Sequence, residues 1–94
     1  MQKDLENLPR ETVAICMNCL YGNPQFLRLA DMAINKYGYI SCVFRHHQIP
    51  DDHIFKSKKE CEAYLIWLIP SVKNEKRRKQ LQFILEHILR SHFE

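Results

Sequence analysis

Six residues that break regular backbone structure constrain the fold of this 94-residue chain more than any other feature of its sequence. Proline lacks a backbone N–H donor and glycine favours turns, so helices and strands tend to end at these residues. A chain of this length buries roughly 60–65% of its unfolded surface in one modest core. We therefore expect a flexible arm over residues 1–9 and a single domain over residues 10–94. The breaks fall at Pro9, Gly22, Pro24, Gly38, Pro50 and Pro70.

Two helices are predicted between Pro9 and Gly38, one on each side of the break at Gly22–Pro24. Gly22 suits a left-handed helix end, Asn23 suits an N-cap and Pro24 suits the first position of a new helix. The second helix is therefore expected from Pro24 to about Lys36. In the first, residues 10–21, apolar side chains at the i, i+3, i+4, i+7 spacing share one helical face: Val13, Cys16, Met17 and Leu20.

Residues 39–56 have the pattern of a β-hairpin. Apolar side chains alternate with others through Tyr39–His47, which is typical of a half-buried strand. The stretch Ile49–Asp52 predicts a turn, and residues 53–56 then return as a second short strand. A helix-turn-helix over Phe26–His47 is the minority alternative, because this stretch is rich in β-branched and aromatic residues.

Two further helices are expected after the hairpin. Ser57 and Glu60 have the spacing of a capping box, which starts a third helix that ends at or kinks at Pro70. A fourth helix, capped by Ser71, is expected to run to about Ser91. The fold class is therefore α+β and mainly helical, with about four helices and a small β-hairpin between the second and third. An all-α bundle is the alternative. The apolar stripe of the fourth helix is Leu81, Ile84, Leu85, Ile88 and Leu89.

The cysteines and histidines need weighing as metal ligands. Cys16 and Cys19 have the C-x2-C spacing of a zinc half-site or a redox pair, and Cys42 with His46 or His47 is a second candidate pair. However, the first pair falls inside a predicted helix, where free cysteine is commonly a small buried residue. We therefore assign no metal and no cofactor, and keep Cys16, Cys19, Cys42 and His46 as candidate zinc ligands. Disulfides are not expected in a reducing compartment.

No catalytic motif is recognisable in the chain. There is no Ser/His/Asp set, no glycine-rich phosphate loop and no HExxH stretch. His46, His47 and His53 flank the predicted hairpin turn, and we interpret them as exposed polar residues rather than proton shuttles. We therefore expect that the protein is not an enzyme.

A basic segment lies near the C-terminus. Between Lys73 and Arg90 there are six basic and two acidic residues, although the whole chain has a net charge of only +3. A basic cluster at a helix start opposes the helix dipole, so a bound polyanion would offset that cost. A solvated charged face is the competing interpretation. The candidate polyanion-binding residues are Lys73, Lys76, Arg77, Arg78 and Lys79.

The segment Ala63–Ile69 is apolar on every side of the third predicted helix. A helix of this kind must be covered all round. Either it is the central helix of the domain, or its outer side is buried by another chain, and a buried strand is a third option. Tryptophan and tyrosine are frequent interface anchors. We therefore name Tyr64, Ile66 and Trp67 as candidate partner-binding residues.

Taken together, these features favour a small non-enzymatic interaction protein that binds a protein partner or itself, and inhibits or recruits a larger complex. The first alternative is a nucleic-acid-binding regulator that uses Lys73–Lys79, and the second is a small zinc-stabilised module. The chain begins with polar residues and has no apolar run near the ~20 residues that a membrane helix needs, so we expect a cytoplasmic protein.

Overall fold

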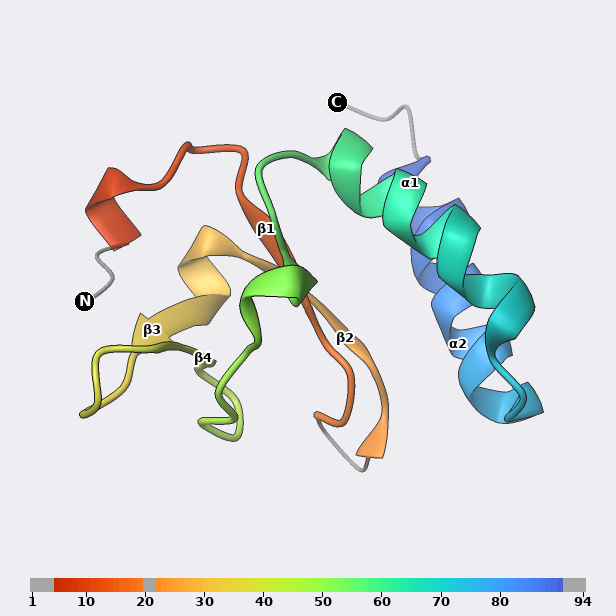
Figure 1. The fold of residues 1–94 in the computed structure, drawn as a ribbon, viewed down its shortest axis with the longest axis horizontal. Coiled ribbons are helices and arrows are strands. Elements are labelled where there is room, and N and C mark those ends of the chain that lie inside the picture. Colours follow the sequence, from red (N-terminus) through yellow and green to blue (C-terminus); the bar gives the residue numbers. More distant parts are fainter. Residues whose placement is uncertain (1–4, 20–21, 91–94) are drawn as a thin grey trace.

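The computed structural model describes residues 5–19 and 22–90, and these form two small β-sheets and a pair of helices (Figure 1). The strands come first: β1 (Val13–Cys16), β2 (Gln25–Arg28), β3 (Met32–Ile34), β4 (Ile40–Cys42) and β5 (Ile54–Phe55). Helices α1 (Lys58–Leu68) and α2 (Glu75–Ile84) follow, and a π-helical turn at Leu85–Leu89 continues α2. Mixed α+β structure is consistent with part of our prediction. The expectation of about four helices with one hairpin is wrong.

Strand β1 lies at the centre of the molecule. It is the middle strand of an antiparallel sheet with the order β2-β1-β5. All four of its residues are buried, because other elements cover both of its faces. Val13 and Ile15 pack among the residues of the helices, whereas Ala14 and Cys16 pack among those of β3 and β4. The alternation of the strand thus sends neighbouring side chains into two different cores.

The predicted helices over residues 10–21 and 24–36 are both wrong, and the burial of β1 explains the first of these errors. A strand that is buried on both faces reads as a continuous apolar run, so some of its residues also fall at helical spacing. Strand β1 replaces the first predicted helix, and β2, a 3-10 turn at Leu29–Asp31 and β3 replace the second. Leu20 and Tyr21, at the end of the first predicted helix, lie outside the described residues.

Strands β3 and β4 form a separate two-stranded antiparallel sheet. A tight turn joins them, in which the Asn35 side-chain oxygen accepts hydrogen bonds from the N–H groups of Tyr37 (2.9 Å) and Tyr39 (3.0 Å). Gly38 donates its N–H to the Asn35 carbonyl at 3.0 Å and has φ of 85°, a conformation that costs glycine no steric strain.

The hairpin that we predicted over residues 39–56 is therefore also wrong in its pairing. Its first half contains β4, which pairs with β3. Its second half contains β5, which pairs with β1. The helix-turn-helix alternative over Phe26–His47 fails as well, because that stretch contains β3 and β4. Local alternation identified strand residues here, but pairing partners are set by contacts between distant segments.

Helix α1 begins where the capping box predicted. The Ser57 hydroxyl oxygen accepts a hydrogen bond from the Glu60 N–H at 3.3 Å, and the Glu60 carboxylate accepts one from the Lys56 N–H at 2.9 Å. The helix ends before Pro70, which lies in a 3-10 turn at Ile69–Ser71. Both ends of this predicted helix are thus confirmed.

Helix α2 starts later than predicted. Asn74, rather than Ser71, is its N-cap, and its side-chain oxygen accepts a hydrogen bond from the Arg77 N–H at 2.9 Å. The predicted end at Ser91 lies outside the described residues. Within the described chain, no helix combines the length and the apolar character needed to cross a membrane.

Two cores lie on opposite sides of β1. In Figure 1, the helices stand on one side of β1 and β2, and β3 and β4 stand on the other. The helical core consists of Val13, Ile15, Phe55, Cys61, Leu65, Ile69, Leu81, Ile84 and Leu85. The hairpin core consists of Ala14, Cys16, Cys19, Leu27, Met32, Ile40, Cys42 and Ile49. Three of the four cysteines therefore belong to one small core.

Candidate metal centre

The first pair of cysteines lies at the end of β1 and in the turn that follows it. Cys16 is the last residue of β1, and three residues later the chain turns at Cys19. The Cys19 N–H donates to the Asn23 carbonyl at 2.8 Å, and the Gly22 N–H donates to the Cys19 carbonyl at 3.0 Å. Gly22 has φ of 76°, so the tight turn depends on a glycine at this position. We call the described residues of this segment, 17–19 and 22–23, the ligand loop.

The second pair comes from the end of β4. Cys42 is the last residue of that strand, and the chain loops back so that the Cys42 N–H donates to the His47 carbonyl at 3.0 Å. The His46 N–H donates to the Cys42 carbonyl at 2.9 Å. His46 has φ of 58°, a left-handed conformation that reverses the chain. The reversal brings the side chain of His47 back toward the cysteines.

These two pairs converge on one point. The candidate ligand atoms of Cys16, Cys19, Cys42 and His47 all lie within 4.8 Å of one another. The Sγ atoms of Cys19 and Cys42 are 3.7 Å apart, and His47 Nδ1 is 3.7 Å from Cys16 Sγ. In a tetrahedral site with Zn–S bonds of about 2.3 Å, two sulfur ligands lie about 3.8 Å apart. The donor set and its spacing therefore fit zinc, and these four residues could hold it.

The surroundings of the sulfur atoms act in opposite directions on the pKa values of two candidate ligands, Cys16 and Cys42. Burial raises the pKa of Cys16 to about 12, with the neighbouring Cys42 and Cys19 contributing in the same direction. Burial also acts to raise the pKa of Cys42. Hydrogen bonds from the backbone N–H groups of Arg45 and His47, and from the other two thiols, outweigh it and lower that pKa. The backbone that follows β4 thus favours the thiolate form of Cys42, and a bound cation would supply the charge that favours the thiolate form of Cys16.

The structure brings together three of the four ligands that we considered from the sequence. Cys16, Cys19 and Cys42 meet, but the histidine beside them is His47 and not His46. From the sequence, either His46 or His47 could be the fourth ligand. The left-handed backbone of His46 reverses the chain, so that His47 lies beside the cysteines. The C-x2-C spacing was the sequence signal that pointed to this cluster. It was discounted because the residues around it were assigned to a helix.

Cys61 lies apart from this cluster. It is fully buried in the helical core, where burial raises its pKa to about 12. A buried thiol of this kind is inert and packs as a small apolar side chain. Cys61 therefore provides a matched control for experiments on the metal centre.

The candidate partner-binding residues lie on α1. Leu65 faces the helical core and is fully buried, whereas Ile66 and Trp67 are 48% and 69% exposed. This chain therefore does not cover the helix on every side. Tyr64 is half-buried, and its ring centroid lies 5.2 Å from that of Phe55 and 5.9 Å from that of Trp67, with the rings tilted to one another. A row of three rings thus leads from the core to the surface.

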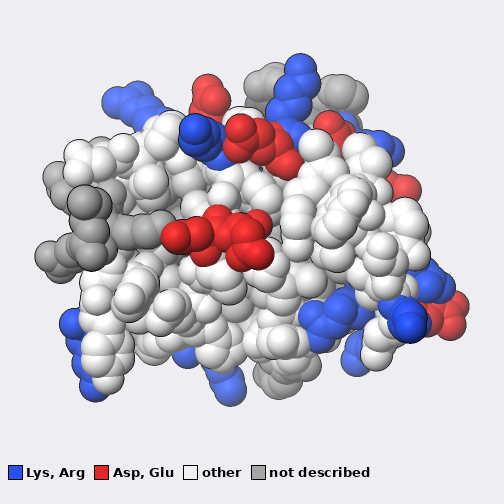
Figure 2. Space-filling model, viewed as in Figure 1, with Lys and Arg blue, Asp and Glu red and all other residues white. Residues whose placement is uncertain are grey.

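The basic segment is partly engaged within the molecule. Arg77 donates hydrogen bonds to the ligand loop, and Arg78 donates to the Val72 carbonyl at 3.1 Å. Lys79 pairs with Glu75 at 3.5 Å, while Lys73 and Lys76 are exposed. On the face drawn in Figure 2, basic side chains lie at several places around the rim, and some of them gather at the lower right beside an acidic group. Three of the five residues thus have partners within the molecule, and polyanion binding by the segment stays a prediction.

A scan against protein-family models, a search of curated proteins and a search of solved structures found no match for this chain. What the molecule does must therefore be inferred from its own residues. The most specific chemical feature among them is the cluster of three cysteines and one histidine.

Proposed function

We propose that this protein is a small zinc-stabilised interaction module rather than an enzyme. The observation that carries the proposal is the meeting of Cys16, Cys19, Cys42 and His47 within 4.8 Å. Four protein donors fill the tetrahedral coordination of zinc, which is typical of structural sites, whereas catalytic sites keep one position open for water. The metal would thus hold β1, the ligand loop and the end of β4 together.

The partner in this proposal is a protein that docks on α1. Trp67 is a large apolar side chain with 69% of its surface exposed, and Ile66 lies beside it. A tilted contact with the Tyr64 ring, 5.9 Å between centroids, restricts the Trp67 ring, and this lowers the entropy lost when a partner covers it. Pre-ordered tryptophan side chains of this kind often dominate binding energy. Nucleic-acid binding through the basic segment stays a prediction.

The zinc proposal makes a direct prediction for two neighbouring histidines. Purified protein should contain one equivalent of zinc by elemental analysis, and His47→Asn should lose it. His46→Asn should keep it, because asparagine tolerates the left-handed backbone and His46 is not a ligand. His47→Cys should also keep one equivalent, since a fourth thiolate is a zinc ligand. Wild-type protein with far less than one equivalent, after refolding with zinc, would count against the site.

The docking proposal predicts that one substitution, Trp67→Ala, weakens binding but leaves stability almost unchanged. Trp67→Ala should change the free energy of unfolding by less than about 0.5 kcal/mol, because the side chain is exposed. The same change should weaken self-association or partner binding by about 2 kcal/mol or more. Analytical ultracentrifugation and pull-down from the native host measure this. Phe83→Ala on α2, 58% exposed, is the matched aromatic control. A monomeric wild type that captures no partner contradicts the proposal.

A further inference from the structure

Arg77 of α2 reaches across the molecule to the peptide between two candidate metal ligands. Its Nη1 atom donates to the Met17 carbonyl at 2.7 Å, and its Nη2 atom donates to the Asn18 side-chain oxygen at 2.5 Å. A longer contact of 3.4 Å joins Nη2 to the Gly22 carbonyl. Met17 and Asn18 are the two residues that separate Cys16 from Cys19. One guanidinium group therefore spans both ends of the ligand loop.

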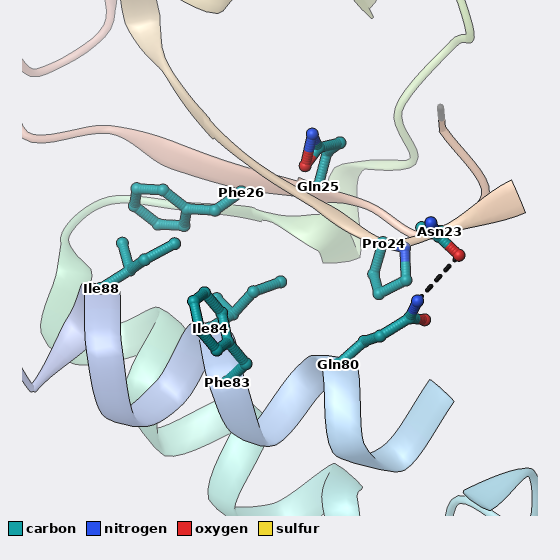
Figure 3. A pocket seen from close by; sticks show the side chains of 8 residues that line it. All are labelled: Asn23, Pro24, Gln25, Phe26, Gln80, Phe83, Ile84 and Ile88. Carbon is teal, nitrogen blue, oxygen red and sulfur yellow. Dashed lines mark hydrogen bonds between the residues drawn. The ribbon is translucent and has the colours of Figure 1, made fainter. Parts of the chain in front are cut away.

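A second side chain of α2 holds the same loop. Gln80 lies three residues after Arg77 and thus on the same helical face. Its Nε2 atom donates to the Asn23 side-chain oxygen at 2.8 Å, as the dashed line in Figure 3 shows. Beyond this bond, Phe83 and Ile84 of α2 line a groove of about 410 Å³ with Pro24 of the chain leading into β2. The loop that positions Cys19 is therefore also the place where α2 docks on the sheet.

We propose that Arg77 is a positioning residue of the metal centre, and that metal occupancy and the docking of α2 are coupled through it. This inference rests on the zinc proposal above. The guanidinium fixes carbonyl and amide oxygens of the ligand loop, so the loop holds Cys16 and Cys19 at ligand spacing before the metal binds. Outer-shell groups that orient ligands in this way typically contribute 10–100-fold to metal affinity.

The coupling acts in both directions. If the docked helix orders the ligand loop for the metal, the bound metal must favour the docked helix by the same factor. In the metal-free protein, the ligand loop loses its cross-link to Cys42 and His47, so Arg77 and Gln80 hold a less ordered loop. Amides of α2 should therefore exchange with solvent faster without zinc than with it.

The experiment compares two adjacent arginines. Zinc affinity is measured by competition with a chromophoric chelator for wild type, Arg77→Ala and Arg78→Ala. Both arginines lie on α2 and are half-buried, but the side chain of Arg78 donates to the Val72 carbonyl, which lies just before the same helix and away from the ligand loop. We expect about a 10–100-fold loss of affinity for Arg77→Ala and less than about threefold for Arg78→Ala. Arg77→Lys should fall between wild type and Arg77→Ala, because an ammonium group cannot bridge several oxygens.

Asn18→Ala keeps the test decisive if Arg77→Ala folds poorly. Asn18 is exposed and its side-chain oxygen accepts a hydrogen bond from Arg77. Its removal therefore weakens the contact between Arg77 and the ligand loop without changing any residue of α2. Asn18→Ala alone should lower the zinc affinity, and an affinity equal to that of wild type would contradict the role of the Arg77–Asn18 bond. Where Arg77→Ala does fold, a double-mutant cycle with Asn18→Ala should be non-additive in zinc affinity. Hydrogen exchange of α2 with and without zinc gives a second readout.

The possible failures are distinguishable. Wild-type protein that binds no zinc contradicts the proposed function itself. Wild-type protein that binds zinc, together with equal affinities for Arg77→Ala and Arg78→Ala, contradicts only the role of Arg77. Exchange rates in α2 that do not depend on zinc contradict the coupling.

Discussion

Removal of the metal should lower the midpoint of thermal unfolding by about 15–30 °C. A ligand that binds only the native state stabilises it by about 4 kcal/mol when free zinc is about 1,000 times its Kd. For a domain of this size, each kcal/mol shifts the midpoint by about 4–8 °C. Calorimetry with saturating zinc, and again with a strong chelator, measures the shift. Acid should have the same effect as the chelator, because protons compete with zinc for the thiolates and the imidazole.

The hairpin core explains why this effect should be large. A two-stranded sheet such as β3–β4 is marginal alone in water, and three of the eight buried residues of the hairpin core are candidate ligands. Cys42→Ala should abolish the chelator-dependent shift, since no complete site remains. Cys61→Ala should retain it, because Cys61 lies in the other core. A midpoint that is the same with and without chelator in the wild type would rule out a structural metal.

Leu81→Ala should lower the free energy of unfolding by about 2–5 kcal/mol, the usual cost of removing a buried leucine side chain and leaving a cavity. Leu81 is fully buried in the helical core, where it packs in the same cluster as Leu65 and Ile15. Urea unfolding in zinc-saturated buffer measures the change while the metal site stays filled.

The matched change on the same helix is Phe83→Ala. Phe83 is 58% exposed, so its removal should change stability by less than about 0.5 kcal/mol. The comparison tests the orientation of α2 directly. Equal losses at the two positions would mean that the helix packs with a different face on the sheet.

Much of the C-terminal half could be predicted from local patterns. The Ser57–Glu60 capping box and Pro70 bound α1 because caps and proline act on the backbone within one helical turn. The apolar stripe of the last predicted helix also faces inward: Leu81, Ile84 and Leu85 are buried, and Ile88 and Leu89 pack partly buried against them. Only the start of that helix was misplaced, at Ser71 instead of Asn74.

The N-terminal half could not be predicted in this way. The residues of β1 are buried on both faces, so their apolar character carries no alternation that would distinguish a strand from a helix. Strand β5 contains only Ile54 and Phe55, and it exists because β1 lies beside it. Misassignment of β1 in turn placed Cys16 and Cys19 in a helix, and this removed the structural context that supports a metal site.

The sequence by itself determined the donors, the glycine turn at Gly22 and the two helices that cover one side of the sheet, because each depends on a few consecutive residues. Only the tertiary structure decided that Cys19 meets Cys42, 23 residues away, and that His47 rather than His46 joins them. The tertiary structure also showed that the Arg77 side chain donates hydrogen bonds to the ligand loop and is not a fully exposed basic group. These outcomes depend on strand pairing and chain reversal between distant segments, and no local pattern encodes the partner of a strand.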